Sequence, residues 1–255
     1  MIAAAAQLLV SVRRGATPRL EAFPPALAPQ TLADAYAIQH EVLRELGTSI
    51  AGWKATLFDA TTGLCAPLAA NSVLDAPAYL RPSRLPTRNN TRFGIEPEIA
   101  FRLGTDLPPL PDGARYEREA VSAAIVSAHA VIEVMVSRFA DFEAVTQLER
   151  IADSFMNELL IVGPSLPAWR ALALAELPFE IRVDDKPVLQ GRGGHPLGDP
   201  LLPVVWLANH LLEQGRLLRA GEIVTTGSCA GLRYVQAEQS VSAYFAGLGT
   251  AVVRF

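Results

Sequence analysis

The chain has 255 residues, of which 50% are apolar and 19% charged, so it can bury a sizeable core and global disorder is excluded. Its net charge is −4, its only adjacent basic pair is Arg13-Arg14, and its longest apolar run is interrupted by polar residues. These features predict neither a nucleic-acid partner nor a membrane span. Two cysteines, Cys65 and Cys229, are too few for a disulfide framework and favour a reduced, cytoplasmic compartment.

The first 80 residues contain two predicted helices. The first covers residues 2–13, and the second covers 32–46, with Thr31 as its N-cap and Gly47 as its C-terminal stop. A mixed stretch follows to Leu80. The next segment, 81–92, is polar and rich in turn residues, which predicts a loop or the edge of a lid.

A strand carrying two glutamates comes next. Glu96 and Glu98 alternate with apolar residues over 93–101, so their carboxylates point the same way and can converge on one point. Glu133 interrupts a second apolar run, 130–136, and needs a partner if that run enters the core. Three carboxylates suit a hard cation such as Mg²⁺ or Mn²⁺. The alternative is an ordinary strand with one face in water.

The remaining elements predict the fold class. Strands occur in groups and helices in separate blocks, without regular βαβα alternation, which predicts an α+β fold with an antiparallel or mixed β core. We expect residues 1–80 to form a helical cap segment, packed in one structural unit on a β-rich, metal-binding core at 81–255. Within that core we expect a loop at 107–113, helices at 118–127, 142–151 and 200–214, a hairpin at 179–191 turning at 184–187, and strands at 159–162, 222–226, 234–236, 240–245 and 251–255.

Several segments, in this order and spacing, resemble the 2-keto-4-pentenoate hydratase and 4-oxalocrotonate decarboxylase family, within the fumarylacetoacetase-like superfamily. They are Asp34–Gln39, Gly52-Trp53-Lys54, the Glu-x-Glu strand at 95–101, Ile132-Glu133, Gly194–Pro200, Trp206–Asn209, Ala220–Ser228 and Gly247–Gly249.

The resemblance implies a rolled, mixed β-sheet of the fumarylacetoacetase C-terminal-domain type, surrounded by helices. It implies Mg²⁺ or Mn²⁺ at Glu96, Glu98 and Glu133, and a homo-oligomer. The implied substrate is a small 2-oxo acid that chelates the metal. We therefore expect a lyase that hydrates a short 2-hydroxydienoate, with decarboxylation of a 4-oxalocrotonate-type diacid as the alternative.

Candidate residues around the substrate follow from the same resemblance. Lys54 would bind substrate oxygens or transfer a proton, unless it is a surface lysine beside Trp53. Asp153 would orient water, unless it caps a helix or is solvated. Ser228, with Thr226 before it, would bind the substrate carboxylate, unless the segment is only a strand-ending turn.

One segment departs from the family pattern. The sequence Asp153-Ser154-Phe155-Met156-Asn157 stands where the family has Asp-Asn-Ala-Ser-Ser, so Asn157 takes a place on the substrate-facing wall. This change leaves open a different class of function. The chain would then be a catalytically idle paralogue that binds metal, or one that supports a pathway enzyme in a hetero-complex.

Overall fold

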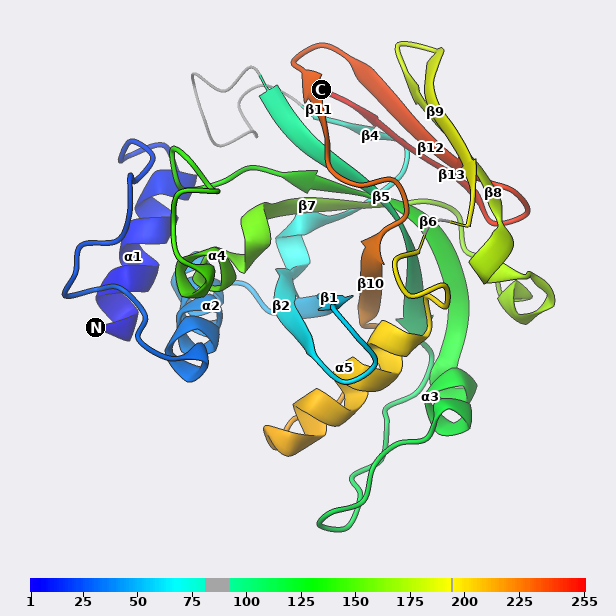
Figure 1. The fold of residues 1–255 in the computed structure, drawn as a ribbon, viewed down its shortest axis with the longest axis horizontal. Helices are drawn as coiled ribbons and strands as arrows, with labels where there is room; N and C mark the ends of the chain where they lie inside the picture. The colour runs from blue at the N-terminus through cyan, green and yellow to red at the C-terminus, as the bar shows by residue number, and fades with distance from the viewer. Residues whose placement is uncertain (81–91, 194) are drawn as a thin grey trace.

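The computed structural model describes residues 1–80, 92–193 and 195–255, and these fold into two β-sheets with helices around them (Figure 1). The predicted loop or lid edge at 81–92 lies outside the described residues except for Arg92, and so does Gly194 of the quoted motif. Parallel and antiparallel strand pairs both occur, which confirms the predicted mixed α+β fold.

The larger sheet positions the three glutamates. Its strands follow the order β2-β1-β10-β5-β6-β7-β3, with β11 pairing with β5 beyond the end of β10. Most pairs are antiparallel, but β1 with β10 and β3 with β7 are parallel. The strands are β1 (Ile50–Leu57), β2 (Gly63–Ala69), β3 (Val73–Asp75), β5 (Arg92–Leu103), β6 (Ile125–Met135), β7 (Asn157–Val162), β10 (Ile223–Ser228) and β11 (Arg233–Gln236).

The smaller sheet lies to one side of the larger one, at the upper right of Figure 1. Its order is β4-β13-β12-β8-β9, and it includes the predicted hairpin. Asp184 and Asp185 both have positive φ, so the hairpin turns on two residues rather than on the four predicted. The strands are β4 (Ala78–Tyr79), β8 (Pro178–Val183), β9 (Lys186–Arg192), β12 (Ser240–Phe245) and β13 (Gly249–Arg254).

Three helices, α1 (Ile2–Arg13), α2 (Leu32–Leu46) and α4 (Gln147–Ala152), gather at one end of the larger sheet (Figure 1). The helix predictions for 2–13 and 32–46 are confirmed. Thr31 and Asp34 form a capping box at the start of α2, and Gly47 ends it with φ 65°. Helix α5 (Leu202–Glu213), close to its predicted bounds, packs against β1, β2 and β10, and α3 (Arg118–Ala124) lies beside α5 and β6.

Two helix predictions were too long. The helix predicted over 118–127 ends at Ala124, because β-branched Ile125 and Val126 already belong to β6. The helix predicted over 142–151 begins only at Gln147. There Thr146 and Glu149 form a capping box, which fixes the first turn.

The predicted boundary at residue 80 does not follow the strand order. The mixed stretch before Leu80 contributes β1 and β2 to the larger sheet and β4 to the smaller one. Strand β1 lies beside β10, from the other end of the chain, so residues 50–79 are built into the β core. Only the helical part before Ile50 corresponds to the predicted cap segment.

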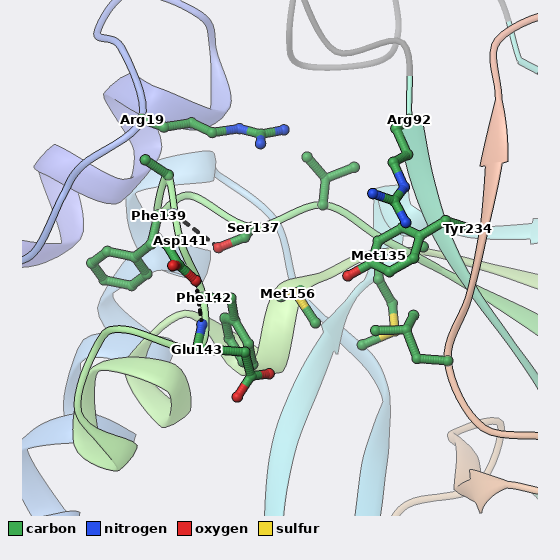
Figure 2. Close-up of a pocket in the computed structure, with 14 residues that line it drawn as sticks. Arg19, Arg92, Met135, Ser137, Phe139, Asp141, Phe142, Glu143, Met156 and Tyr234 are labelled. Atoms are coloured by element: carbon green, nitrogen blue, oxygen red, sulfur yellow. Dashed lines mark hydrogen bonds between the residues drawn. The ribbon is translucent and has the colours of Figure 1, made fainter.

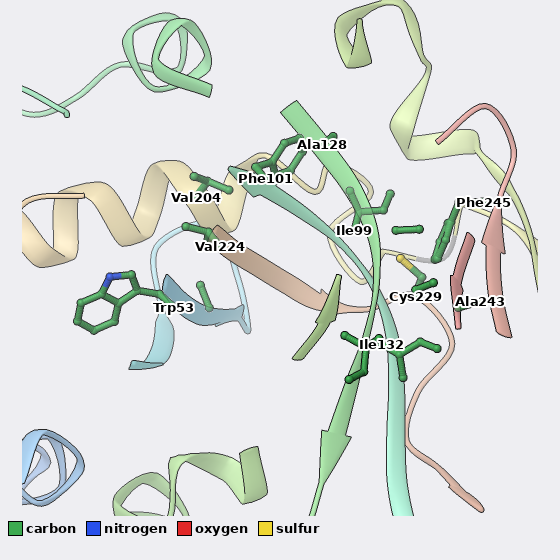
Figure 3. Close-up of a cluster of buried hydrophobic side chains, with 14 of the residues drawn as sticks. Trp53, Ile99, Phe101, Ala128, Ile132, Val204, Val224, Cys229, Ala243 and Phe245 are labelled. Atoms are coloured by element: carbon green, nitrogen blue, oxygen red, sulfur yellow. The ribbon is translucent and has the colours of Figure 1, made fainter. Parts of the chain in front are cut away.

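The main core fills the space between the larger sheet, α5 and the smaller sheet (Figure 3). Ile99, Phe101 and Ile132 point into it from β5 and β6, Val204 from α5, and Phe245 from β12. Because these apolar side chains occupy one face of β5 and β6, the glutamates that alternate with them lie on the opposite face. Among the described helices, none combines the length and the apolar character needed to cross a bilayer.

Candidate active site

The three predicted metal ligands meet on one face of the larger sheet. Glu96 of β5 lies directly opposite Glu133 of β6 in the antiparallel register, and Glu98 is two residues along from Glu96. Residues opposed in this way share a face, and so do residues i and i+2. One carboxylate oxygen from each glutamate lies within 4.8 Å of the other two. The alternative of an ordinary solvent-facing strand is excluded, since Glu133 is fully buried and Glu98 is 1% exposed.

Apolar residues surround the glutamates on this face. Ala100 and Val131 flank them on β5 and β6, and Leu160 of β7 lies opposite Glu133. They form a small cluster with Leu68, Val162 and Ile223. The carboxylates therefore lie among apolar side chains, where charges interact more strongly than they do in water.

Lys54 is the cationic partner of Glu133. Its Nζ atom donates to both carboxylate oxygens of Glu133, at 2.8 Å each. Asn157 Nδ2 donates to Glu133 Oε1 at 2.7 Å. Lys54 and Asn157 are 6% and 4% exposed, so the alternative of a surface lysine beside Trp53 is wrong. A buried carboxylate needs such donors, because unpaired burial of its charge costs several kcal/mol.

A β-bulge in β10 orients Glu98. The register with β5 shifts between Thr225 and Ser228, which turns two consecutive backbone N–H groups toward this carboxylate. Thr226 N and Gly227 N donate to Glu98 Oε2 at 3.0 and 2.8 Å. Gly227 has φ 102°, a conformation that L side chains rarely adopt. The family-like Thr-Gly-Ser turn thus holds one of the three carboxylates in place.

The electrostatics of the cluster shift its titrations. Burial, followed by the neighbouring carboxylates, raises the pKa of Glu98 to about 8. Burial and Glu133 raise the pKa of Glu96 to about 6. Burial acts to lower the pKa of Lys54, but Glu133, Glu96 and Glu98 outweigh it and raise that pKa. The cluster holds more negative charge than one lysine balances, which is the condition in which a divalent cation binds.

Asp153 makes its contacts away from this cluster, with Arg138. The guanidinium forms an ion pair with the Asp153 carboxylate, and Arg138 Nη2 donates to the Asp153 carbonyl oxygen at 2.7 Å. The same side chain donates to the carbonyl oxygen of Asn157 at 3.2 Å and to Glu158 at 3.1 Å. Arg138 therefore ties together both ends of the segment that carries Asn157.

Replacing Arg138 with methionine should destabilise the protein by about 3–5 kcal/mol, because the buried Asp153 carboxylate loses its cation. Urea unfolding measures the difference. Arg150→Met is the matched control, since Arg150 pairs with the exposed Glu143 and should cost only about 0–1 kcal/mol. An Arg138→Met protein as stable as the control would contradict this assignment.

Between Asp153 and Asn157 the backbone is strained. Ser154, Phe155 and Met156 all have positive φ, of 51°, 50° and 65°. Consecutive non-glycine residues in the left-handed region cost about 1–3 kcal/mol each and persist only where the surroundings impose them. Here the Phe155 ring lies 5.9 Å from Lys54 Nζ, and Asn157 reaches Glu133. The segment that departs from the family pattern thus forms one wall of the site.

The hydroxyls of β10 divide between the two faces of the sheet. Thr226 Oγ1 donates to the carbonyl oxygen of Ile99 at 2.8 Å, so this side chain is engaged by the strand. Ser228 lies opposite Glu98 and is half-buried. Thr225 lies opposite Ala100 and beside Lys54, on the glutamate face, and its buried hydroxyl has no hydrogen-bond partner among the described residues. Thr225 was not predicted from the sequence, although strand alternation from Lys54 and Glu98 could have indicated it.

Comparisons with known proteins show sequence similarity to hydratases. The chain is 29% identical over 161 residues to a 2-keto-4-pentenoate hydratase of Burkholderia vietnamiensis, covering 63% of this chain and 60% of the relative. It is 31% identical over 160 residues to a 2-hydroxyhexa-2,4-dienoate hydratase of Comamonas testosteroni, covering 63% and 59%. These alignments span about 60% of the length of the hydratases.

A solved structure matches over the whole chain. It is the 4-oxalocrotonate decarboxylase of Pseudomonas putida G7 in complex with magnesium and adipate, with a TM-score of 0.83 and 24% identity, covering 100% of this chain and 97% of that one. This match confirms the fumarylacetoacetase-type fold expected from the resemblance. The family model for the fumarylacetoacetate (FAA) hydrolase C-terminal domain matches residues 66–255. That segment contains all three glutamates and most of the chain, and the chain belongs to this family.

Proposed function

We propose that this protein is a divalent-metal-dependent lyase that adds water to a short 2-hydroxydienoate, in its 2-oxo-enoate form. The observation that carries the proposal is the convergence of Glu96, Glu98 and Glu133 within 4.8 Å of one another, with Lys54 beside them. The hydratases among the relatives support hydration as the reaction.

The donor set fits Mg²⁺ or Mn²⁺. All three side chains offer carboxylate oxygens, which are the ligands of hard cations, and Glu133 keeps lone pairs beyond those used by Lys54 and Asn157. A divalent ion held there would supply Lewis-acid polarisation of the 2-oxo group of the substrate. The solved 4-oxalocrotonate decarboxylase, in complex with magnesium, supports this choice of ion.

Residues of the chain would bind the substrate and stabilise the charge that develops on it. Lys54, kept as an ammonium by the surrounding carboxylates, would donate a hydrogen bond to a substrate oxygen and stabilise negative charge that develops there. Thr225, with its unpartnered hydroxyl, and the half-buried Ser228 would bind the substrate carboxylate or the attacking water. Thr226 would contribute through its backbone N–H, which orients Glu98.

Asn157 and Asp153 would act at the wall of the site. Asn157 would fix the orientation of Glu133 by its hydrogen bond. Asp153 would position Asn157 indirectly. Its ion pair with Arg138, which also donates to the Asn157 carbonyl oxygen, supports this role. The apolar side chains that flank the glutamates would limit the access of bulk water to the reacting carbons.

The test is the loss of the ultraviolet absorbance of a 2-hydroxydienoate, measured with Mg²⁺ and after chelation. We expect rapid loss only when the divalent ion is present. Absence of metal-dependent turnover with every short dienoate would refute the proposal and favour the idle paralogue. Release of CO₂ from a diacid, without hydration, would support the second candidate, decarboxylation, which the full-length match to the decarboxylase favours.

The pH dependence of stability gives a further prediction. The pKa values of Glu96 and Glu98 are raised, to about 6 and about 8, from an ordinary value of 4.5, so their contribution to stability is present at acid pH and is lost as the pH rises through 6 to 8. Without divalent ions, the protein should therefore become less stable toward pH 8.5.

Mg²⁺ should reverse this loss, because protons no longer compete for the carboxylates at high pH. At a hundredfold excess over Kd the ion adds about 2.7 kcal/mol, or about 5–10 °C in Tm. Thermal scans at pH 5.5 and 8.5, with and without Mg²⁺, measure the effect. A Mg²⁺-induced shift that is equal or larger at pH 5.5 would contradict it.

Self-association to a homo-oligomer, a complex with a pathway enzyme and a cytoplasmic location stay predictions. Light scattering on the purified chain, alone and mixed with candidate partners, tests the first two. Turnover by the chain alone would exclude the hypothesis that it only supports an active partner.

A further inference from the structure

Phe155 places an aromatic ring beside the Lys54–Glu133 ion pair, at a position where the family pattern has alanine. Lys54 Nζ lies over the ring, 5.9 Å from its centroid, which is within the range of a cation–π contact. Only 7% of the Lys54 side chain is exposed, and Glu133 is fully buried. The ring therefore helps Glu133 to bury the ammonium group.

The Lys54 ammonium keeps one N–H group without a strong acceptor. An ammonium carries three N–H groups, and in the described part of the chain Lys54 donates only to the two oxygens of Glu133. Water in the place of the ring would bind the remaining N–H group, and a substrate oxygen would have to displace it. With the ring there, a substrate meets an ammonium that is already desolvated and oriented.

Packing against the helices holds the ring in place. Phe155 is the middle residue of the left-handed turn, with φ 50° and ψ 47°. Its side chain packs against a second apolar cluster, which includes Leu9 of α1, Ile38 of α2 and Ile151 of α4. These helices therefore support the ring while Lys54 lies over its face.

The next residue in the turn, Met156, lines a different space. That space is a pocket of about 200 Å³, which Met135 and Tyr234 also line (Figure 2). The described lining of this pocket includes neither Phe155 nor the three glutamates. Of the two bulky apolar side chains in the turn, Phe155 is therefore the one that bounds the site beside Lys54.

We propose that Phe155 is a positioning residue, whose ring excludes water from the Lys54 ammonium and keeps one N–H group available to a substrate oxygen. Alanine at this position, as in the family pattern, would leave room for water beside the ammonium. The inference rests on the proposed function for the substrate oxygen. The exclusion of water is a property of the chain itself and can be tested without substrate.

Lys54 and Lys186 are the only lysines of the chain, so labelling with ¹⁵N-lysine gives two ammonium signals in NMR spectra. Their hydrogen exchange with water, measured on the Mg²⁺-loaded protein, reports access to solvent. We expect slow exchange at Lys54 and fast exchange at the exposed Lys186. Phe155→Ala should speed exchange at Lys54 about tenfold, the factor equivalent to one cation–π contact, whereas Phe155→Tyr, which keeps the ring, should leave it slow.

Two further variants separate the ring from the packing of the helices. Phe155→Leu keeps the apolar packing without a ring and should also speed exchange at Lys54. Phe23→Ala is the matched control, because Phe23 is buried in the same apolar cluster, where its ring packs edge-to-face on Phe139 at 5.5 Å. Exchange at Lys54 should stay slow in this variant.

Three results would overturn the proposal: equally fast exchange at Lys54 in Phe23→Ala, unchanged exchange in both Phe155→Ala and Phe155→Leu, or exchange at Lys54 as fast as at Lys186 in the unmodified protein. Turnover adds a second readout. Phe155→Ala should lower kcat about tenfold, less than the loss of Lys54 itself, and Phe155→Tyr should restore most of it. Equal kcat in Phe155→Ala and the unmodified protein would exclude the positioning role. Failure of the proposed function would instead show as no metal-dependent turnover in any of these proteins, with exchange at Lys54 still dependent on the ring.

Discussion

Replacing Glu133 with glutamine is expected to reduce metal-dependent turnover by a factor of about 10³ or more. Glu133 is one of three converging carboxylates, and Lewis-acid catalysis by a bound ion contributes several kcal/mol to the transition state. Loss of its charge weakens the ion's site and frees Lys54 from its closest partner. Initial rates at saturating Mg²⁺ measure the change.

The same substitution should lower stability by about 3 kcal/mol, because Lys54 remains buried without a carboxylate paired to it. Glu119→Gln is the matched control, since Glu119 is exposed on α3 and should change neither quantity. A Glu133→Gln protein that keeps a tenth of its activity would exclude this residue as a ligand of a required ion.

Lys54→Met should have the second largest effect, a fall in kcat of about 10²- to 10³-fold, the range for loss of one donor that stabilises developing negative charge. The substitution also removes the one lysine that neutralises the three carboxylates. Without divalent ions the variant should therefore be less stable, and Mg²⁺ should raise its Tm more than it raises that of the unmodified protein. Thermal scans and steady-state kinetics test both effects together.

Lys186→Met is the control for Lys54→Met, because Lys186 is exposed in the β8–β9 hairpin. A Lys54→Met protein with unchanged kcat and unchanged response to Mg²⁺ would show that Lys54 is a structural partner of Glu133 and has no part in the chemistry.

The metal site was predictable from the sequence because its signal is local. Glu96 and Glu98 stand at the spacing that puts two side chains on one face of a strand, and Glu133 interrupts a run too apolar for a surface. The register that sets Glu96 opposite Glu133 is a non-local pairing, which spacing alone does not determine. The resemblance to a known family supplied that link.

Other features depend on contacts far apart in the chain. Strand β1 is stabilised by pairing with β10, some 170 residues later in the chain. Its glycine-containing sequence has too low a β-propensity to predict a strand on its own. Arg138 meets Asp153 at the start of a turn whose three left-handed residues no propensity favours. Thr226 was predicted at the substrate from the resemblance, but the strand register places Thr225 on the glutamate face, and the Thr226 hydroxyl donates to the Ile99 carbonyl oxygen instead.

Crystals grown with Mn²⁺ and measured at the manganese absorption edge would show whether the three glutamates bind one divalent ion. We expect one strong anomalous peak on the face of β5 and β6, from an ion bound by carboxylate oxygens of Glu96, Glu98 and Glu133. The peak should be absent from the Glu133→Gln variant under the same conditions. A well-ordered crystal that shows no peak between these three carboxylates, at a Mn²⁺ concentration that sustains turnover, would contradict it.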